Sequence, residues 1–189
     1  MPKVFISYSH KDEDWKKRLQ TQLAVLEIQD LLSVWDDRQI AAGDDWYPEI
    51  EWAIESAHVA ILLISANFLS SGFIQGKEVP PLLERRKNEG LRVIPLILKP
   101  CPWQAVDWLS KIQGRPKDNQ PLSGLSEHHQ DRCLSELALE INELFKSILP
   151  STKPDSPEKP TAPPASTLTT YDPRNAAFLV PFRDRKSVV

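Results

Sequence analysis

The sequence predicts one α/β domain over residues 1–149, built on a parallel sheet with helices on both faces. Short apolar runs rich in strand-forming residues alternate there with segments whose apolar residues recur at helical spacing. That order is typical of parallel strands joined by right-handed helical crossovers. One run, residues 59–64, is apolar at every position, as expected of a central strand covered on both faces. Proline becomes frequent from Pro150 onward, which marks the end of the domain.

The first half of the domain holds two predicted strands and two predicted helices. Residues 4–6 form a buried strand that opens into a polar loop, and residues 31–35 form the second strand. Asp12 is placed to cap the first helix, and Pro48 suits the first turn of the second. The apolar stripes of the two helices are Trp15, Leu19, Leu23 and Leu26, and then Ile50, Ala53, Ile54 and Ala57.

The second half continues the alternation. Residues 58–64 form the third strand, and a helix follows near residues 77–88 with two prolines in its first turn. Residues 91–98 form the fourth strand, where Pro95 favours a position near the sheet edge or a local bulge. A short fifth strand is expected near residues 110–113. The last helix carries the stripe Leu134, Leu137, Ile141, Leu144, Phe145 and Ile148.

Beyond the domain, six of the fifteen residues from Pro150 to Pro164 are proline, with Ser, Thr, Lys and Glu among the rest. Such a composition cannot bury enough apolar surface to offset the entropy lost on ordering. We therefore expect residues 150–177 to be a disordered Pro/Ser/Thr-rich linker. Residues 178–182 are apolar again, so residues 178–189 are interpreted as the start of a further domain or a tail.

Composition and charge argue against several classes of function. The formal net charge of −3 argues against nucleic-acid binding, which needs a clustered excess of Lys and Arg. Cys101 and Cys133 have neither CxxC nor Cys/His spacing, so no metal site is expected. The N-terminus lacks the pattern of a signal peptide, and no apolar run is long enough to cross a bilayer. We expect a cytoplasmic protein without membrane contact.

Polar residues follow three of the predicted strands at the point where each strand ends. They are Ser7-Tyr8-Ser9, Trp35-Asp36-Asp37 and Ser65-Ala66-Asn67. In open parallel sheets, ligands bind beyond the carboxyl ends of the strands, where the strand order reverses. The sequence therefore predicts a site at this end of the sheet. Neither a glycine-rich dinucleotide loop nor a P-loop motif is present.

Three segments in register resemble the Toll/interleukin-1 receptor (TIR) domain family. The opening strand motif is Val-Phe-Ile-Ser-Tyr-Ser at residues 4–9. The BB loop of the family is matched by Arg-Gln-Ile-Ala-Ala-Gly-Asp-Asp-Trp at residues 38–46, in a form similar to prokaryotic immune TIR domains. The third motif is Leu-Ile-Ser-Ala-Asn-Phe-Leu-Ser-Ser at residues 63–71, followed by Glu78. Order and spacing fit the family across residues 1–149.

The resemblance implies a flavodoxin-like, five-stranded parallel sheet and a domain that works by homotypic TIR–TIR association. Many relatives cleave NAD⁺ between nicotinamide and ribose, with NAD⁺ as the substrate and no cofactor, whereas others are non-enzymatic adaptors. By the family match, Glu78 is the catalytic residue. The substrate-binding positions implied by the match are Ser9, His10, Ile40, Ala41, Gly43 and Phe73.

The chemistry of this bond explains why one carboxylate could suffice. Nicotinamide leaves as a neutral molecule, so little acid catalysis is needed, while the ribose becomes oxocarbenium-like and a carboxylate beside it stabilises that cation. A helix N-terminus at Glu78 would favour its ionised form. The alternative interpretations are an ordinary first-turn acid for Glu78 and an exposed loop histidine for His10.

The leading hypothesis is a TIR domain that, once assembled, cleaves NAD⁺ to nicotinamide and ADP-ribose or a cyclic isomer in immune signalling. The BB loop, within residues 36–46, would pack on a neighbouring copy to complete the pocket. The alternatives are a non-enzymatic interaction module and a receiver-like regulator. Receivers carry an acidic cluster after the first strand, whereas the first strand of this sequence ends in Ser-Tyr-Ser, which argues against the regulator. Residues 178–182 loosely resemble the lead-in to a STAND-type nucleotide-binding domain, which would be a partner in the same chain.

Overall fold

A computed structural model of the chain describes residues 1–37 and 46–148. Contacts divide the chain into two units, Met1–Ser151 and Thr152–Val189, and the fold given below is that of the first. Outside the described residues lie the predicted linker 150–177, the segment 178–189 and residues 38–45 of the BB loop.

Strands and helices alternate along the described chain in the predicted order. The helix predicted near residues 77–88 is α4, and it is preceded by a π-helical segment, η3. In chain order the elements are β1 (Lys3–Ser7), η1 (His10–Asp12), α1 (Glu13–Glu27), β2 (Ser33–Trp35), α2 (Trp46–Ser56), β3 (Val59–Ile64), α3 (Ala66–Leu69), η3 (Ile74–Glu78), α4 (Val79–Asn88), β4 (Arg92–Ile97), η4 (Trp103–Ala105), η5 (Leu122–Gly124) and α5 (Glu127–Ile148).

The sheet is parallel, with the strand order β2-β1-β3-β4. Val4 of β1 lies opposite Val34 on one side and opposite Val59 on the other, so β1 and β3 are the central strands. The chain moves outward to β2 from β1 and then crosses back to β3, which makes the β1–β3 boundary the point where strand order reverses. Ligand sites of this fold class lie beyond the carboxyl strand ends at that point.

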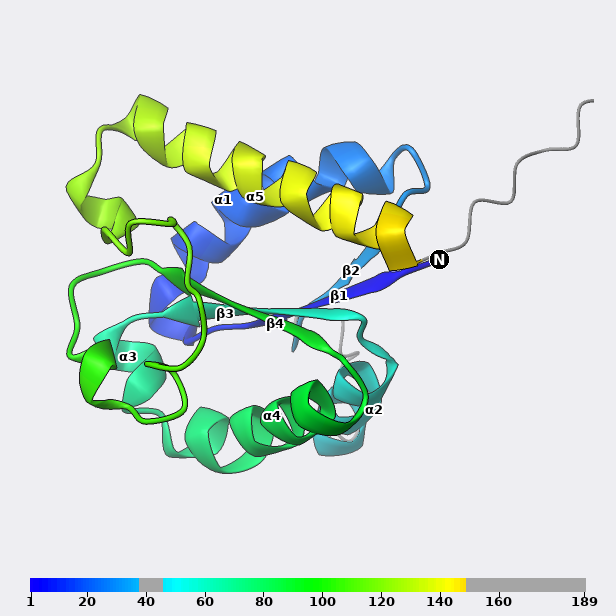
Figure 1. Ribbon diagram of the computed structural model, residues 1–189, viewed down its shortest axis with the longest axis horizontal. Coiled ribbons are helices and arrows are strands. Elements are labelled where there is room, and N and C mark those ends of the chain that lie inside the picture. Colours follow the sequence, from blue (N-terminus) through cyan, green and yellow to red (C-terminus); the bar gives the residue numbers. More distant parts are fainter. Residues whose placement is uncertain (38–45, 149–189) are drawn as a thin grey trace, which may run out of the picture. The chain divides into compact units, whose positions relative to one another are not determined.

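Helices cover both faces of the sheet (Figure 1). Helices α1 and α5 pack on one face over Val4 and Ile6, and α2 and α4 pack on the other face over Phe5. All six residues of β3 are buried, which confirms the prediction of a central strand from its unbroken apolar run. Since side chains alternate along a strand, Ser7 lies on the same face as Phe5, toward α2 and α4.

The predicted fifth strand near residues 110–113 is wrong, because the sheet has four strands within residues 1–37 and 46–148, and residues 107–111 form a turn. Arg115 pairs with the outer edge of β4, with its backbone nitrogen 2.7 Å from the oxygen of Pro95 and its carbonyl oxygen 2.8 Å from the nitrogen of Ile97. Pro116 follows and has no N–H to donate, so this pairing does not extend.

Pro95 lies in β4, which is an edge strand as its proline predicted. Its carbonyl faces Arg115 on the outer side of β4. The nitrogen of a strand residue points to the same side as its carbonyl, so the missing N–H of Pro95 leaves no gap in the ladder between β3 and β4.

Asp12 behaves differently from the prediction. It occupies the N-cap position of α1, but its side chain makes no capping hydrogen bond. The carboxylate instead lies buried, where it accepts hydrogen bonds from Ser65 and from the Nζ atom of Lys99, the latter at 2.6 Å. One residue thereby links the segments that follow β1, β3 and β4.

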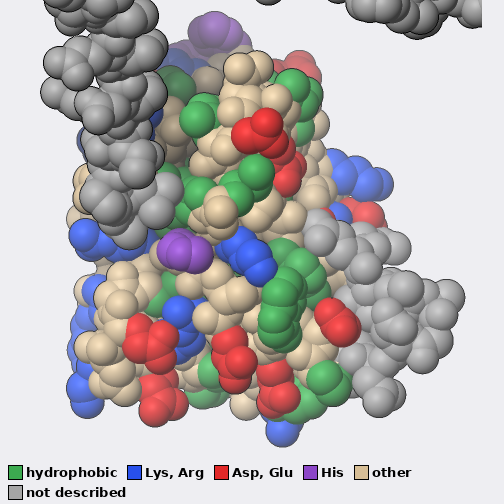
Figure 2. Space-filling model, turned by 90° about the vertical axis from the view of Figure 1, so that its right-hand side faces the viewer, with side chains coloured by type: hydrophobic (Ala, Val, Ile, Leu, Met, Phe, Trp, Pro, Cys, Tyr) green, Lys and Arg blue, Asp and Glu red, His purple; other side chains and the backbone are tan. Residues whose placement is uncertain are grey.

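The side of the domain that carries the N-terminus and the amino ends of the strands shows acidic and basic side chains interspersed (Figure 2). No large group of one charge is visible on this face outside the area drawn in grey. In the described part of the chain, no helix is both long and apolar enough to span a membrane.

Candidate active site

A pocket of about 400 Å³ lies at the carboxyl ends of the strands, beside the point where strand order reverses. Its volume falls within the range of about 300–1,000 Å³ that is usual for small-molecule sites. The lining combines two carboxylates, an imidazole and three hydroxyl groups with apolar and aromatic walls. The lining residues are Tyr8, Ser9, His10, Asp37, Ile50, Ser71, Phe73, Ile74 and Glu78.

Glu78 is the buried acid of this pocket, with 8% of its surface exposed. It is the last residue of η3, and α4 follows it directly. The hydroxyl of Ser7, at the end of β1, donates a hydrogen bond to its Oε2 atom. A π-helical turn widens the helix and is frequent at functional sites. Here it delivers the carboxylate of Glu78 to the end of a strand that lies 71 positions earlier in the chain.

Burial raises the pKa of Glu78 from 4.5 to about 7, and the negative charge of Asp37 adds to the rise. The hydrogen bond from Ser7 and the charge of His10 lower the pKa of Glu78 but do not offset the burial. The pKa of Glu78 is thus raised overall, although a helix N-terminus was expected to favour the ionised form. The N–H of Val79, the first residue of α4, already bonds to the carbonyl of Ile74 and does not point freely at the carboxylate.

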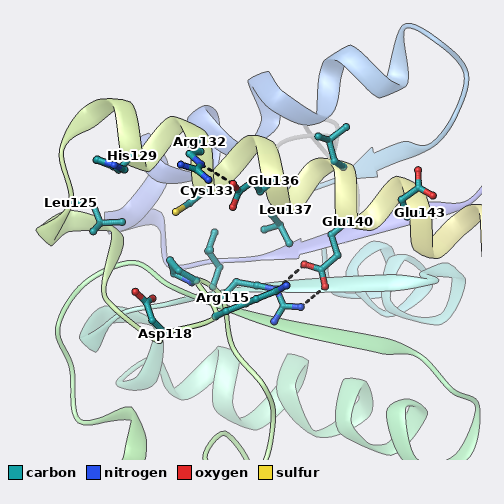
Figure 3. A pocket seen from close by; sticks show the side chains of 14 residues that line it. Arg115, Asp118, Leu125, His129, Arg132, Cys133, Glu136, Leu137, Glu140 and Glu143 are labelled. Carbon is teal, nitrogen blue, oxygen red and sulfur yellow. Dashed lines mark hydrogen bonds and ion pairs between the residues drawn. The ribbon is translucent and has the colours of Figure 1, made fainter.

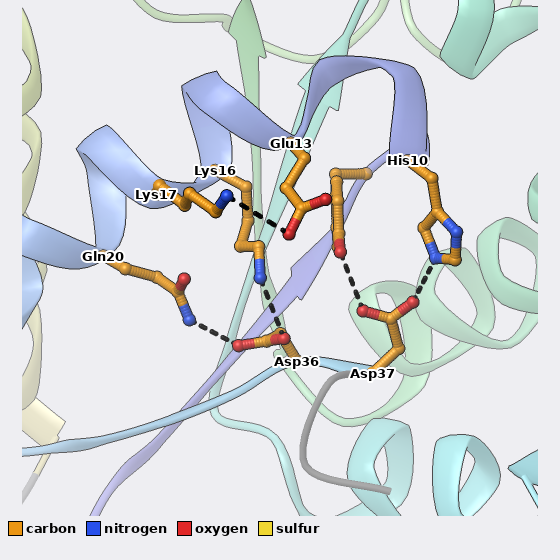
Figure 4. Close-up of polar contacts among 8 residues, drawn as sticks. His10, Glu13, Lys16, Lys17, Gln20, Asp36 and Asp37 are labelled. Atoms are coloured by element: carbon orange, nitrogen blue, oxygen red, sulfur yellow. Dashed lines mark hydrogen bonds and ion pairs between the residues drawn. The ribbon is translucent and has the colours of Figure 1, made fainter.

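Asp37 supplies the second carboxylate of the pocket, and both of its oxygens are engaged (Figure 4). The hydroxyl of Tyr8 donates to Oδ1 at 2.9 Å, and Nε2 of His10 pairs with Oδ2. The rings of Tyr8 and His10 also contact each other, with centroids 5.5 Å apart. Tyr8 is 6% exposed, so it holds Asp37 from a rigid position under the more exposed His10.

The neighbouring acid, Asp36, points away from the pocket and has a structural role (Figure 4). It is buried, and it pairs with Nζ of Lys16 at 3.1 Å and with the side-chain amide of Gln20. This arrangement joins the end of β2 to α1. Of the two adjacent acids, only Asp37 lines the pocket.

One wall of the pocket is apolar and aromatic. Phe73 and Ile50 line it, and the rings of Phe73 and Tyr47 form a T-shaped pair with centroids 6.4 Å apart. Lys77 lies over the ring of Tyr47, with Nζ 5.3 Å from its centroid, and it lines a separate hollow. A positive charge is thereby directed away from the Glu78 pocket.

Four residues predicted from the sequence, Ser9, His10, Phe73 and Glu78, line this one pocket. The other three, Ile40, Ala41 and Gly43, lie outside the described residues. Ser7 and Asp37 were predicted as members of the polar strand ends that mark the site, but not among the substrate-binding positions. Ser7 ends an apolar strand on the face shared with Phe5, and that position is the signal for its contact with Glu78.

A larger hollow of about 780 Å³ lies beside α5 and the outer edge of β4 (Figure 3). Both of its arginines are paired with glutamates: Nε of Arg115 lies 2.7 Å from Glu140, and Nε of Arg132 lies 2.8 Å from Glu136. Burial raises the pKa of the Cys133 thiol, which favours its unreactive protonated form. This hollow lies at the outer edge of β4 and not at the β1–β3 boundary, and none of the carboxylates that line it is buried, so the Glu78 pocket is the better candidate.

A model of the TIR domain family matches residues 4–127. The chain belongs to the TIR domain family. The match begins in β1 and ends at the start of α5, so it includes every residue that lines the Glu78 pocket.

One curated relative is an uncharacterized protein, y4lF, of Sinorhizobium fredii (strain NBRC 101917 / NGR234). It is 36% identical over 123 residues, which make up 65% of this chain and 38% of the relative. The matched part thus spans well under half of that protein. The name of the relative states no activity, so a reaction for this TIR domain has to be inferred from its own site.

Solved structures that are similar include the TIR domain of the Toll-related receptor TRR-2 from Hydra magnipapillata, at 19% identity and a TM-score of 0.46 over 69% of this chain and 96% of that one. The TIR domains of the activated Roq1 resistosome show 20% identity and a TM-score of 0.42 over 74% and 84%. A prokaryotic SEFIR domain shows 19% identity and a TM-score of 0.49 over 88% and 100%. The family assignment does not depend on these similarities.

Proposed function

We propose that this TIR domain self-associates and, when assembled, cleaves NAD⁺ to nicotinamide and ADP-ribose or a cyclic isomer, as part of cytoplasmic immune signalling. The observation that carries the proposal is the buried Glu78 carboxylate in a pocket at the carboxyl ends of the strands. NAD⁺ is the substrate, and no cofactor takes part.

The pocket suits the nicotinamide half of the substrate. Phe73 and Ile50 give the planar ring an apolar and aromatic surface, while the hydroxyls of Ser9 and Ser71 offer hydrogen bonds to sugar oxygens. The carboxylates of Glu78 and Asp37 line the same small pocket, so a positively charged group bound there is stabilised.

The reaction requires Glu78 in its ionised form. As the bond between C1′ and the nicotinamide nitrogen breaks, the electron pair leaves with nicotinamide and positive charge develops on the ribose. A carboxylate at the pocket wall stabilises that charge more strongly in a dry site than in water. A substrate that already carries a positive nicotinamide ring also favours the ionised form of Glu78.

The test is incubation of concentrated protein, or protein clustered through a fused oligomerisation tag, with NAD⁺, followed by chromatography for nicotinamide. We expect release that rises more than in proportion to protein concentration, since the BB loop would complete the pocket in an assembly. Absence of nicotinamide, together with self-association detected by light scattering, would favour the non-enzymatic interaction module instead.

A further inference from the structure

We propose that His10, oriented by Asp37, is the general base that activates water for the second half of the reaction, so that the linear product ADP-ribose predominates. This inference rests on the proposed NAD⁺ cleavage and adds a role that the cleavage step itself does not need. It follows from the arrangement of Tyr8, His10 and Asp37 beside Glu78.

Asp37 orients the imidazole ring of His10. A carboxylate only accepts hydrogen bonds, so Nε2 of His10 carries the hydrogen that is directed to Oδ2 of Asp37. In a neutral ring the lone pair is then on Nδ1. Within the described part of the chain, Nδ1 of His10 has no hydrogen-bond partner, and in Figure 4 it points away from Asp37. An acceptor is thus available at the mouth of the pocket.

Asp37 is itself held in place by Tyr8. The other oxygen of Asp37 is held by the hydroxyl of Tyr8 at 2.9 Å, and Tyr8 is nearly fully buried. A base whose ring is fixed by a carboxylate, which is itself fixed by a third group, is the arrangement that activates nucleophiles in hydrolytic enzymes. The carboxylate of Asp37 also stabilises the imidazolium that forms when His10 takes up a proton.

His10 and Asp37 lie in the same pocket as the buried carboxylate of Glu78. His10, Asp37 and Glu78 line the same pocket, and the charges of His10 and Asp37 both act on Glu78. Glu78 is buried and held by Ser7, whereas the side chain of His10 is 69% exposed. The buried carboxylate therefore suits the ribosyl cation, and the exposed imidazole suits a water molecule that arrives from solvent.

The atoms balance without a further reactant. The bond between C1′ and the nicotinamide nitrogen breaks, and nicotinamide takes the electron pair. The oxygen of water bonds to C1′ while Nδ1 of His10 accepts one proton from that water. His10 then releases the proton to solvent, so the sum is NAD⁺ and water giving nicotinamide, ADP-ribose and a proton.

A competing nucleophile that carries no proton provides the test. A pyridine such as 3-acetylpyridine attacks C1′ through its lone pair and needs no base, whereas water does. Clustered protein is incubated with NAD⁺ and 3-acetylpyridine, and the ratio of ADP-ribose to the exchanged dinucleotide is measured by chromatography. The variants are His10→Asn and Asp37→Asn, with His128→Asn and Asp107→Asn as matched controls at exposed positions outside the pocket.

We expect the ratio to fall about tenfold in both pocket variants and to stay at the wild-type value in both controls. General bases usually contribute about 10²–10⁴-fold, and the effect is smaller here because a ribosyl cation reacts readily even with unactivated water. The exchange product should still form in both pocket variants, and the ratio is measured because it does not depend on how far the total release of nicotinamide falls when a residue of the pocket is changed.

An unchanged ratio in His10→Asn would overturn the inference while leaving NAD⁺ cleavage intact. Loss of the exchange product together with ADP-ribose would also overturn it, since His10 would then act in binding or in bond cleavage. A mainly cyclic product from the wild-type protein would also overturn the inference, because water would then not be the main nucleophile. If the wild-type protein releases no nicotinamide with or without the pyridine, the proposed function itself fails.

Discussion

Asp12 and Glu78 are buried carboxylates at the same end of the sheet, and they differ in how their charge is balanced. Asp12 is 1% exposed and pairs with Nζ of Lys99 at 2.6 Å, with a further hydrogen bond from Ser65. Glu78 is 8% exposed and accepts a hydrogen bond from Ser7, and among the described residues no Lys or Arg forms an ion pair with it.

The difference separates a structural acid from a functional one. The pair of Asp12 with Lys99 joins segments that follow three different strands, so its charge is used in holding the end of the sheet together. Among the described residues Glu78 has no ion-pair partner, and burial raises its pKa to about 7. A buried acid that is costly to ionise and faces a pocket is typical of a functional site, because a cationic group there supplies the missing balance.

The largest expected effect comes from removing the unbalanced charge. Glu78→Gln keeps the size of the side chain and its ability to accept a hydrogen bond from Ser7, but it removes the charge that faces the ribosyl cation. We expect the rate of nicotinamide release to fall by about 10²–10³-fold, as for other preorganised electrostatic groups. The matched control is Glu84→Gln on the exposed face of α4. Full activity in Glu78→Gln would move the catalytic role to another acid, with Asp37 as the pocket alternative.

The same substitution should make the folded domain more stable above pH 7. The pKa of Glu78 is about 7 when folded and 4.5 in its ordinary state, so the folded form binds its proton more tightly. The free energy of unfolding of the wild-type domain therefore falls as the pH rises from about 4.5 to 7. Above pH 7 the total loss from this group reaches about 3 kcal/mol. Urea unfolding at pH 5 and pH 8 should show a gain for Glu78→Gln that is much larger at pH 8. Equal gains at both values would contradict an uncompensated charge.

Removing the cation from the balanced pair should act in the opposite direction. Lys99→Met leaves Asp12 buried with only the hydroxyl of Ser65, and we expect a loss of about 2–3 kcal/mol in the free energy of unfolding. The expected loss lies below that of a fully buried pair, because the Lys99 side chain is 41% exposed. Lys111→Met, at an exposed position, is the control. Adding Asp12→Asn to Lys99→Met should restore part of the stability, and a purely additive double variant would show that the two charges are not coupled.

The fold was predictable because its signals are local. The apolar run of β3, the helical stripe of α5 and the proline in β4 each determined an element or its place in the sheet. The fifth strand was not predictable, since residues 110–113 carry no periodic pattern and the chain there makes a turn. The residue that does pair with β4 is Arg115, and its proline neighbour prevents the pairing from extending.

The place of the site was predictable from the polar strand ends, whereas the roles of its residues were predictable only from the family motifs. They gave Glu78, His10, Ser9 and Phe73, but not the contacts that set the properties of these residues. Asp12 matched the pattern of a helix cap, and its real partners are a serine 53 positions later and a lysine 87 positions later. Such pairings depend on how strand ends meet in space, and a local sequence pattern contains no information about that distance.

The smallest expected effect concerns the hydroxyl that holds the unbalanced acid. The hydrogen bond from Ser7 lowers the pKa of Glu78, so Ser7→Ala should raise that pKa further, because burial and the charge of Asp37 continue to act. The kcat/KM for NAD⁺ should rise with pH through about 7 in the wild-type protein, since this quantity reports the ionisation of the free enzyme. In Ser7→Ala the rise should move to higher pH, with values below wild type at pH 7 and close to it at the alkaline limit. Ser110→Ala, on an exposed turn outside the pocket, should leave the profile unchanged. A uniform loss of activity at every pH would instead show that Ser7 positions the carboxylate without tuning its ionisation.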